Sequence, residues 1–445
     1  MRGLRSLLIL VVLALGLGAY AYFVESKRDP GSATPPREKV FTVESSAITA
    51  LTVTSEGGDR TALEKREAGW QIVEPVEAKV DESEVTSLAS SLSSLEIQRV
   101  VEEQPGDLAQ YGLDAPRIAV EFKAGDVSGR VLVGRKTPTG GDLYAKLASA
   151  DRVFLIPAYL ESSFNRTTFD LRDKDILAFA RDGVDALEIT GGPAPLRLAK
   201  AGADWRLTAP VAARADYSAV EGLVGRLDGG RLAGIVAEQP GDLTAYGLDK
   251  PSLTVRVGSG SAQATLEIGK EAEEGKLYAR DASRPMVFTV DKALADEFRK
   301  PAADLRRKDL FEFRPFNAKK VEIVRGDRTW AFEKVRGEGD DARDTWTQTA
   351  PATAAPDAAT LDAVLSAFSN LRAESFADAT RGTGLDAPAV IFTVEFGSGE
   401  ESRRERVAFG TSGDAAWAAI DGDAGAAKLD KAELDKALKA LDDLG

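Results

Sequence analysis

One set of landmarks occurs three times along the chain, and this repetition limits the possible folds more than any other feature. Each set has a tryptophan on a short apolar run that stops at a proline: Trp70 and Pro75, Trp205 and Pro210, and Trp346 and Pro351. The copies are far longer than solenoid repeats. Each copy is therefore expected to be a domain with its own core.

An aspartate marks the start of the one long helix expected in each copy, at Asp81, Asp216 and Asp357. Its carboxylate can accept hydrogen bonds from the free amides of the first helical turn. The apolar stripe that follows has three- and four-residue spacing, which buries one helix face. The stripe comprises Val85, Leu88, Leu92 and Leu95, then Val220, Leu223 and Leu227, then Leu361, Val364, Phe368 and Leu371. Gly229 and Gly230 replace its last member in the second copy, so that helix is predicted to end early.

Short β-branched and aromatic runs surround each helix, for example at residues 48–54, 118–122 and 143–147. Such short, closely spaced runs favour hairpins over helix-linked parallel strands. The predicted fold class is α+β: three tandem repeats of a mainly antiparallel sheet with one packed amphipathic helix, preceded by an N-terminal transmembrane helix. The predicted repeat modules are residues 40–178, 179–312 and 313–445.

The first residues of the chain predict its location. Arg2 and Arg5 precede an uncharged, apolar run over residues 7–24. As a helix this run would be roughly 27 Å long, close to the thickness of a bilayer's hydrocarbon core. The positive-inside rule keeps residues 1–6 in the cytoplasm, and the proline-containing residues 25–39 form a spacer. We predict a single-pass protein of the inner, cytoplasmic membrane whose bulk is extracytoplasmic.

A cleaved secretory signal is the alternative for this segment. Ala19-Tyr20-Ala21 fits the small-x-small pattern of a cleavage site, although the apolar run continues to Val24. Both interpretations place the body of the protein outside the cytoplasm.

The composition removes whole classes of chemistry, because the chain has no cysteine and no histidine. Disulfides, thiolate nucleophiles, Cys- or His-ligated metals and serine–histidine triads are impossible. The formal net charge of −14 disfavours nucleic acid as a partner. We predict no catalytic residue, no cofactor and no metal site.

The motif QPGDL-x-x-YGLD-x-P stands at residues 104–116 and 239–251, and its tyrosines and aspartates could line a ligand groove. A structural role explains the same residues better. Glycine permits a tight turn, aspartate caps nearby amides, and proline sets an extended entry to the next strand. The tyrosine ring would pack while its hydroxyl finds a local partner. We assign this role to Tyr111, Gly112, Asp114 and Pro116, and to their counterparts Tyr246, Gly247, Asp249 and Pro251. The third copy has Thr383 in place of the tyrosine.

Two other motifs recur. Strands ending in glycine stop at Gly134, Gly269 and Gly410, where a turn is predicted to begin. LRDKD and LRRKD join the copies and supply Arg172, Asp173, Arg306 and Asp309. An anion site is possible there, but a solvated network of salt bridges at a domain junction is the favoured interpretation. The repeated tryptophans are expected in cores rather than as sugar-stacking platforms.

Together, these motifs resemble the domain-of-unknown-function family 4340. The resemblance covers nearly the whole chain after the spacer, most clearly residues 40–311, and the third copy departs from it. It implies a membrane-anchored envelope protein that accompanies ABC-type transport systems of the gliding-motility type. It implies little about activity, because the function of the family itself is unknown.

The expected function is that of a non-catalytic, anchored accessory component of an ABC-type transport system or an envelope assembly. Its partners would be transporter subunits or other envelope proteins, besides the membrane. One alternative is a scaffold or adhesion module that binds envelope polysaccharide or protein. Another is a carboxylate-dependent hydrolase, since the chain has 71 acidic residues. A pair of buried, perturbed carboxylates in one cleft would favour the hydrolase, and an exposed apolar patch would favour a partner surface.

Overall fold

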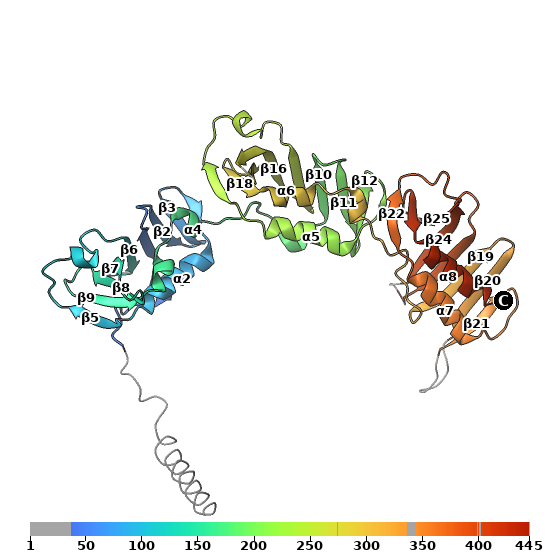
Figure 1. Ribbon diagram of the computed structural model, residues 1–445, viewed down its shortest axis with the longest axis horizontal. Helices are drawn as coiled ribbons and strands as arrows, with labels where there is room; N and C mark the ends of the chain where they lie inside the picture. Colours follow the sequence, from blue (N-terminus) through green and yellow to red (C-terminus); the bar gives the residue numbers. More distant parts are fainter. Residues whose placement is uncertain (1–36, 274, 336–343, 398, 400–401, 445) are drawn as a thin grey trace, which may run out of the picture. The chain divides into compact units, whose positions relative to one another are not determined.

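The computed structural model describes residues 37–273, 275–335, 344–397, 399 and 402–444. The predicted transmembrane helix at residues 7–24 and most of the spacer lie outside these ranges. Within them, no helix has the length and apolar character needed to cross a membrane. The chain divides into two compact units, Met1–Lys174 and Asp175–Gly445 (Figure 1).

The first unit is built on one nine-stranded antiparallel sheet with the order β4-β3-β2-β1-β6-β7-β8-β9-β5. The strands are β1 (Ala50–Thr54), β2 (Arg60–Arg66), β3 (Gly69–Glu74), β4 (Ala78–Lys79), β5 (Arg99–Glu102), β6 (Ile118–Ala124), β7 (Val127–Lys136), β8 (Asp142–Leu147) and β9 (Val153–Pro157). The helices are η2 (Ser45–Ala47), α2 (Glu82–Ser93), η3 (Ala109–Tyr111), α3 (Leu160–Phe164) and α4 (Thr168–Leu171).

The second unit contains two more antiparallel sheets. The nine-stranded one has the order β13-β12-β11-β10-β15-β16-β17-β18-β14. Its strands are β10 (Ala186–Thr190), β11 (Leu196–Ala201), β12 (Asp204–Ala209), β13 (Ala213–Arg214), β14 (Gly234–Ala237), β15 (Leu253–Ser259), β16 (Ala262–Glu273), β17 (Lys276–Asp281) and β18 (Val287–Asp291). Its helices are η4 (Arg181–Gly183), α5 (Tyr217–Asp228), η5 (Thr244–Tyr246), α6 (Lys292–Phe298) and η6 (Ala302–Leu305).

The eight-stranded sheet has the order β21-β20-β19-β23-β24-β25-β26-β22. Its elements are β19 (Ala318–Arg325), β20 (Arg328–Val335), β21 (Thr345–Ala350), α7 (Ala358–Ser369), β22 (Ala373–Ala377), β23 (Val390–Phe396), β24 (Arg403–Ser412), β25 (Ala415–Ile420), β26 (Ala426–Leu429) and α8 (Lys431–Asp442). Apart from the missing two-residue edge strand, its order repeats that of the other two sheets. The chain therefore has three repeated sheet domains, which we call modules 1, 2 and 3, and the α+β prediction is confirmed.

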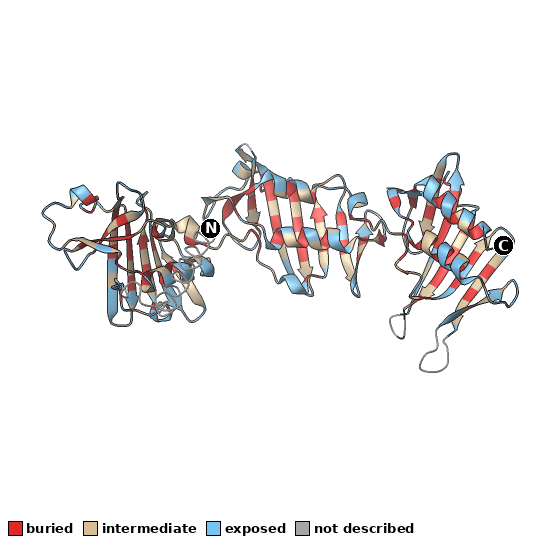
Figure 2. Cartoon of the chain, turned by 60° about the horizontal axis from the view of Figure 1, so that its bottom comes forward, coloured by how far each residue is buried: buried red, intermediate tan, exposed pale blue. Residues whose placement is uncertain are grey.

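A helix covers one face of each sheet, and buried residues alternate with more exposed ones along many strands (Figure 2). The aspartate caps are present: Asp81 accepts from the amides of Ser83 and Glu84, Asp216 from Ala219, and Asp357 from Thr360. Each helix buries its predicted stripe, with Leu88, Leu223 and Val364 at equivalent positions. The repeated sequence therefore forms a repeated structure, in which the helix begins at the same residue, buries the same face and packs on the same kind of sheet.

The prediction that the second helix ends early is wrong, because α2, α5 and α7 each have 12 residues. The last residue of the stripe lies beyond the helix in all three copies. Leu95 and Leu371 follow the C-caps Ser94 and Asn370 and are still buried. Glycine at that position in module 2 therefore does not shorten the helix.

The prediction that the repeated strand-end glycines begin turns is also wrong. Gly134, Gly269 and Gly410 lie inside β7, β16 and β24. A Cβ on Gly134 would lie 2.2 Å from the carbonyl oxygen of Tyr111, and one on Gly269 would lie 2.1 Å from that of Tyr246. Glycine is needed because the backbone of the YGLD loop crosses the strand at this point.

Candidate functional site

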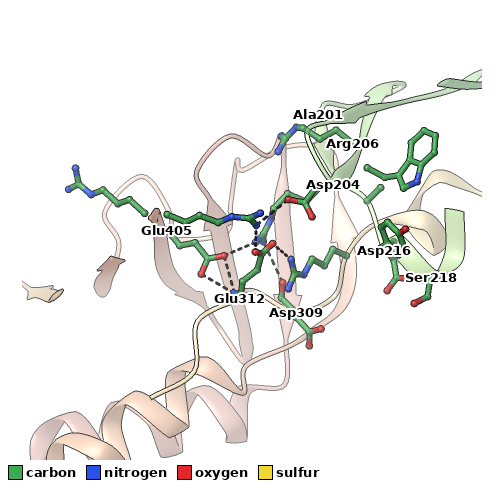
Figure 3. Close-up of a pocket in the computed structure, with 15 residues that line it drawn as sticks. Ala201, Asp204, Arg206, Asp216, Ser218, Asp309, Glu312 and Glu405 are labelled. Atoms are coloured by element: carbon green, nitrogen blue, oxygen red, sulfur yellow. Dashed lines mark hydrogen bonds and ion pairs between the residues drawn. The ribbon is translucent and has the colours of Figure 1, made fainter. Parts of the chain in front are cut away.

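A cleft of about 700 Å³ lies where modules 2 and 3 meet within the second unit. Five arginines and five carboxylates are among the residues that line it (Figure 3). Module 2 contributes the start of β12, the end of β13 and the start of α5, and module 3 contributes β24. Figure 3 shows Asp204, Glu312 and Glu405 gathered around arginines of the cleft, whereas Asp216 lies apart from them.

Arg214, at the end of β13, makes the central contacts of this junction. Its amide donates to Oδ1 of Asp423 at 2.8 Å, and its Nε donates to Oδ2 of the same carboxylate at 3.2 Å. Its Nη1 lies 3.5 Å from Oε1 of Glu405, and its Nη2 donates to the carbonyl of Leu310 at 3.1 Å. The side chains of Arg214 and Asp423 are only 15% and 5% exposed. The pair is thus largely withdrawn from water, where removing one partner costs most.

The loop that carries Asp423, residues 421–425 between β25 and β26, reaches module 2 through its backbone as well. The amide of Ala424 donates to the carbonyl of Ala212 at 2.6 Å. The carbonyl of Gly422 accepts from Arg206 at 2.6 Å, and the carbonyl of Ala424 accepts from Arg306 at 3.1 Å. These three hydrogen bonds, together with the pairing of Arg214 and Asp423, hold one loop of module 3 against module 2.

The pKa of Glu405 on β24 is shifted by this environment. Burial raises the pKa of its carboxyl group. Hydrogen bonds from the amides of Glu312 and Phe313 and the charge of Arg214 oppose that rise, while the Glu312 carboxylate adds to it. The amide of Glu312 donates to both carboxylate oxygens of Glu405, at 3.0 and 2.9 Å.

The rim of the cleft holds a second, more exposed group of charges. Arg403 lies 3.1 Å from Asp204 in module 2 and 2.5 Å from Glu312, which also pairs with Arg307. The side chains of Arg403 and Asp204 are about half exposed. Exposed pairs of this kind contribute about 0–1 kcal/mol each to the free energy of unfolding, so the rim adds little stability to the contact.

This arrangement forms a contact between modules, and it does not favour acid–base catalysis. Both oxygens of Asp423 and both of Glu405 accept hydrogen bonds from the protein, and Asp216 caps α5. A general acid or base must lie within hydrogen-bond reach of the proton that it transfers, and these carboxylates are instead directed at groups of the protein. Across the described ranges, no group of three or more potential ligands could hold a metal ion.

The joining motifs are less solvated than predicted, and here the sequence interpretation needs correction. Arg172 and Arg306 are only 9% and 4% exposed. Each forms an isolated β-bridge with the residue before the helix cap, Val80 and Ala215 respectively. The guanidinium of Arg306 lies 4.0 Å from the ring centroid of Phe376, and burial lowers its pKa. Hydrogen bonding to the carbonyl of Ala424 and contact with an aromatic face explain how Arg306 is buried.

The acidic residues of the same motifs remain closer to solvent. The amide of Asp173 donates to the carbonyl of Lys79 at 3.0 Å. Asp309 pairs with Arg372 at 3.0 Å, and both side chains are well exposed. The solvated salt bridge predicted for the joining motif therefore describes Asp309 but not the arginines.

The YGLD loop packs on its own sheet. Tyr111 is 9% exposed, its ring lies 5.0 Å from that of Tyr144, and its hydroxyl donates to Glu102 at 2.7 Å. That hydrogen bond raises the pKa of Tyr111. The ring of Tyr246 lies 5.1 Å from that of Tyr278 in the same way. The loop thus has the packing geometry expected of a structural element.

The turns of this motif have the backbone that glycine allows, with φ of 65° at Gly112 and 67° at Gly247. Asp114 and Asp249 are exposed. The amide caps come from the earlier aspartates of the motif instead: Asp107 accepts from Ala109 at 2.8 Å and Asp242 from Thr244 at 2.9 Å. Pro116 and Pro251 lie just before β6 and β15, where the chain becomes extended.

The repeated tryptophans lie at equivalent strand positions with unequal burial. Trp205 is 1% exposed, whereas Trp70 and Trp346 are partly buried against their cores. Each stands opposite a lysine of the neighbouring strand, at Lys65, Lys200 and Lys334. The ammonium groups of Lys200 and Lys334 lie 5.1 and 5.0 Å from the rings of Trp205 and Trp346. Pro75, Pro210 and Pro351 follow these strands directly, each after a cis peptide bond.

Most of the chain matches one protein family. Residues 70–204 and 205–388 match the family described as domain of unknown function 4340. The chain belongs to this family. The two matched segments include most of modules 1 and 2 of this family member and part of module 3, and no curated protein matches the chain.

Solved structures give only a remote likeness to this family member. A ligand-bound DNA polymerase sliding clamp from Pseudomonas aeruginosa is 9% identical over 87% of this chain and 92% of that one, with a TM-score of 0.17. A second structure of that clamp is 10% identical over 88% and 93%, with a TM-score of 0.16. At these TM-scores the likeness supports no statement about fold or function.

The sequence analysis missed Arg214, Asp423 and Glu405. Their signal is a departure from the repeat. The pairing register puts Arg214 where module 1 has Lys79. Glu405 stands where module 2 has Ala264, each opposite a valine of the preceding strand. At both positions the residue type differs between equivalent sites of the modules, and these differences mark the contact between modules 2 and 3.

Proposed function

We propose that this protein is a non-catalytic, membrane-anchored extracytoplasmic component that holds a partner protein of an ABC-type transport system or envelope assembly. Its anchor would be the helix predicted at residues 7–24. The observation that carries the proposal is the use of the repeated motifs. Tyr111 packs its loop on the sheet, Gly134 lets that loop cross β7, and Arg306 joins module 2 to module 3. These repeated residues therefore stabilise the modules, whose surfaces are left to bind a partner.

The choice of a protein partner rests on module 3. Phe316 is 81% exposed and Val335 is 50% exposed. They lie on neighbouring segments, because Nζ of Lys334 donates to the carbonyl of Phe316 at 3.1 Å. Exposed apolar residues on neighbouring segments favour a protein surface over a polysaccharide as the bound species. The transport context comes from the family resemblance alone.

The first test is the location of the body of the protein. A reporter fused after Lys39 should be active only outside the cytoplasm. Activity restricted to the cytoplasm would contradict the proposed topology. Mature protein that begins at Tyr22 would show a cleaved signal in place of the anchor.

The second test concerns the partner. The full-length protein is purified from crosslinked native membranes, and the co-purifying proteins are identified. Phe316→Asp should remove at least one of them while the protein remains folded by circular dichroism. Tyr159→Asp is the matched control, since Tyr159 is 72% exposed in the first unit, and it should keep all partners. Unchanged partners in the Phe316 variant would exclude this surface.

A further inference from the structure

We propose that Arg214 and the loop at residues 421–425 form a latch that makes modules 2 and 3 one rigid body. The latch is closed by buried charge pairs and opens into two independently moving modules when those pairs are lost. This inference does not depend on the proposed function.

The latch is local and involves few groups. Arg214 of module 2 binds Asp423 through two hydrogen bonds and approaches Glu405 of module 3. Arg206, on the neighbouring strand, binds the carbonyl of Gly422 in the same loop. Polar groups that satisfy one another while largely withdrawn from water fix a single geometry, since a shift would leave charges without partners there.

The charged groups facing Glu405 and Asp423 come from every element packed at the junction. Arg206 and Arg214 face them from β12 and β13, and Arg403 from β24. Arg307, Asp309 and Glu312 face them from the connection between the modules. Positive and negative groups are therefore interleaved, and the rim pairs support the buried pair without replacing it.

The same strand edge lacks these groups in the other modules. At the positions of Arg206 and Arg214, module 1 has Gln71 and Lys79, as the cross-strand pairing of each edge shows. In module 3, the sequence at the corresponding positions has Thr347 and Ala355. The fold therefore provides the edge, and only the arginines of module 2 convert it into a latch.

The experiment measures the distance between modules 2 and 3 in the full-length protein in detergent. The chain has no cysteine, so introduced pairs are the only labelling sites. Spin labels at Lys250→Cys and Asp414→Cys, both exposed, report the distance across the junction by pulsed electron paramagnetic resonance. A second pair, Asp327→Cys and Asp414→Cys, lies within module 3 and reports whether that module stays folded.

We expect one narrow distance distribution across the junction in the unsubstituted background. Arg214→Ala should at least double its width, and Asp423→Asn, which removes one charge, should broaden it less. Lys79→Ala, the matched change in the first unit, should leave it unchanged. The pair within module 3 should stay narrow in all variants. A narrow junction distribution in Arg214→Ala and Asp423→Asn would overturn the proposal, as would a broad one in the unsubstituted background.

Discussion

Two strand edges with the same backbone pairing behave differently in the two units. In the first unit, β3 and β4 place Gln71 opposite Lys79; in the second, β12 and β13 place Arg206 opposite Arg214. Lys79 is exposed, whereas the side chain of Arg214 is 15% exposed and bound to Asp423. The comparison shows that the repeated sheet places two residues at the same point of its edge, and that their side chains determine whether this edge contacts another module.

The largest effect should come from removing the arginine that distinguishes the two edges. Arg214→Ala leaves Glu405 without its guanidinium partner in a buried site, and it leaves Asp423 with Arg206 alone, at 3.4 Å. This should lower the free energy of unfolding of the second unit by about 3–5 kcal/mol. Lys79→Ala, at the equivalent exposed position, should change stability by less than about 0.5 kcal/mol. Chemical denaturation monitored by hydrogen exchange in each unit measures both. Equal losses in the two variants would break the comparison.

A smaller effect, equal in the two units, should come from the shared scaffold. Gly134→Ala and Gly269→Ala each place a methyl group within 2.2 Å of a loop carbonyl oxygen. Each should cost about 1–3 kcal/mol in its own unit, as forced overpacking does. Gly222→Ala in α5 is the control: no atom lies within 4 Å of its added Cβ, and it should gain up to about 1 kcal/mol. Very different losses at Gly134 and Gly269 would show that the modules are not structural equivalents.

The smallest effect should be a change in pH dependence confined to the second unit. Because burial raises the pKa of Glu405, the folded state binds a proton there more tightly than the unfolded state does. The stability from this group is present below the ordinary glutamate pKa and is lost as the pH rises through the raised value. Glu405→Gln should therefore flatten the gain in stability of the second unit as the pH falls from 7 toward 4.5. A steeper gain in that variant would reverse the assignment.

The fold was largely predictable because its signals are local and repeated. The caps at Asp81, Asp216 and Asp357 and the apolar stripes after them are set by residues within one helical turn of each other. The glycines were harder. Gly134 is required because the backbone at Tyr111, far from it in sequence, crosses β7 beside it. The spacing of residues in the sequence does not show that these two segments meet.

The contact between modules could not be predicted from the motifs, because its residues lie outside them. Arg214 and Asp423 are far apart in sequence and meet only when β13 and the loop before β26 are both in place. The burial of Arg306 likewise depends on Phe376 in the next module. Comparing modules 2 and 3 with each other would have marked both positions, since Arg214 corresponds to Ala355 and Glu405 to Ala264.

A double-mutant cycle between Arg214 and Asp423 tests most directly the claim that side-chain charge joins modules 2 and 3. The free energy of unfolding of the second unit is measured for Arg214→Ala, Asp423→Ala and the double variant. A buried pair should give a coupling free energy of about 2 kcal/mol or more, so the double variant should be much less destabilised than the sum of the single ones. Losses that add to within about 0.5 kcal/mol would contradict the account, because the two residues would then act independently.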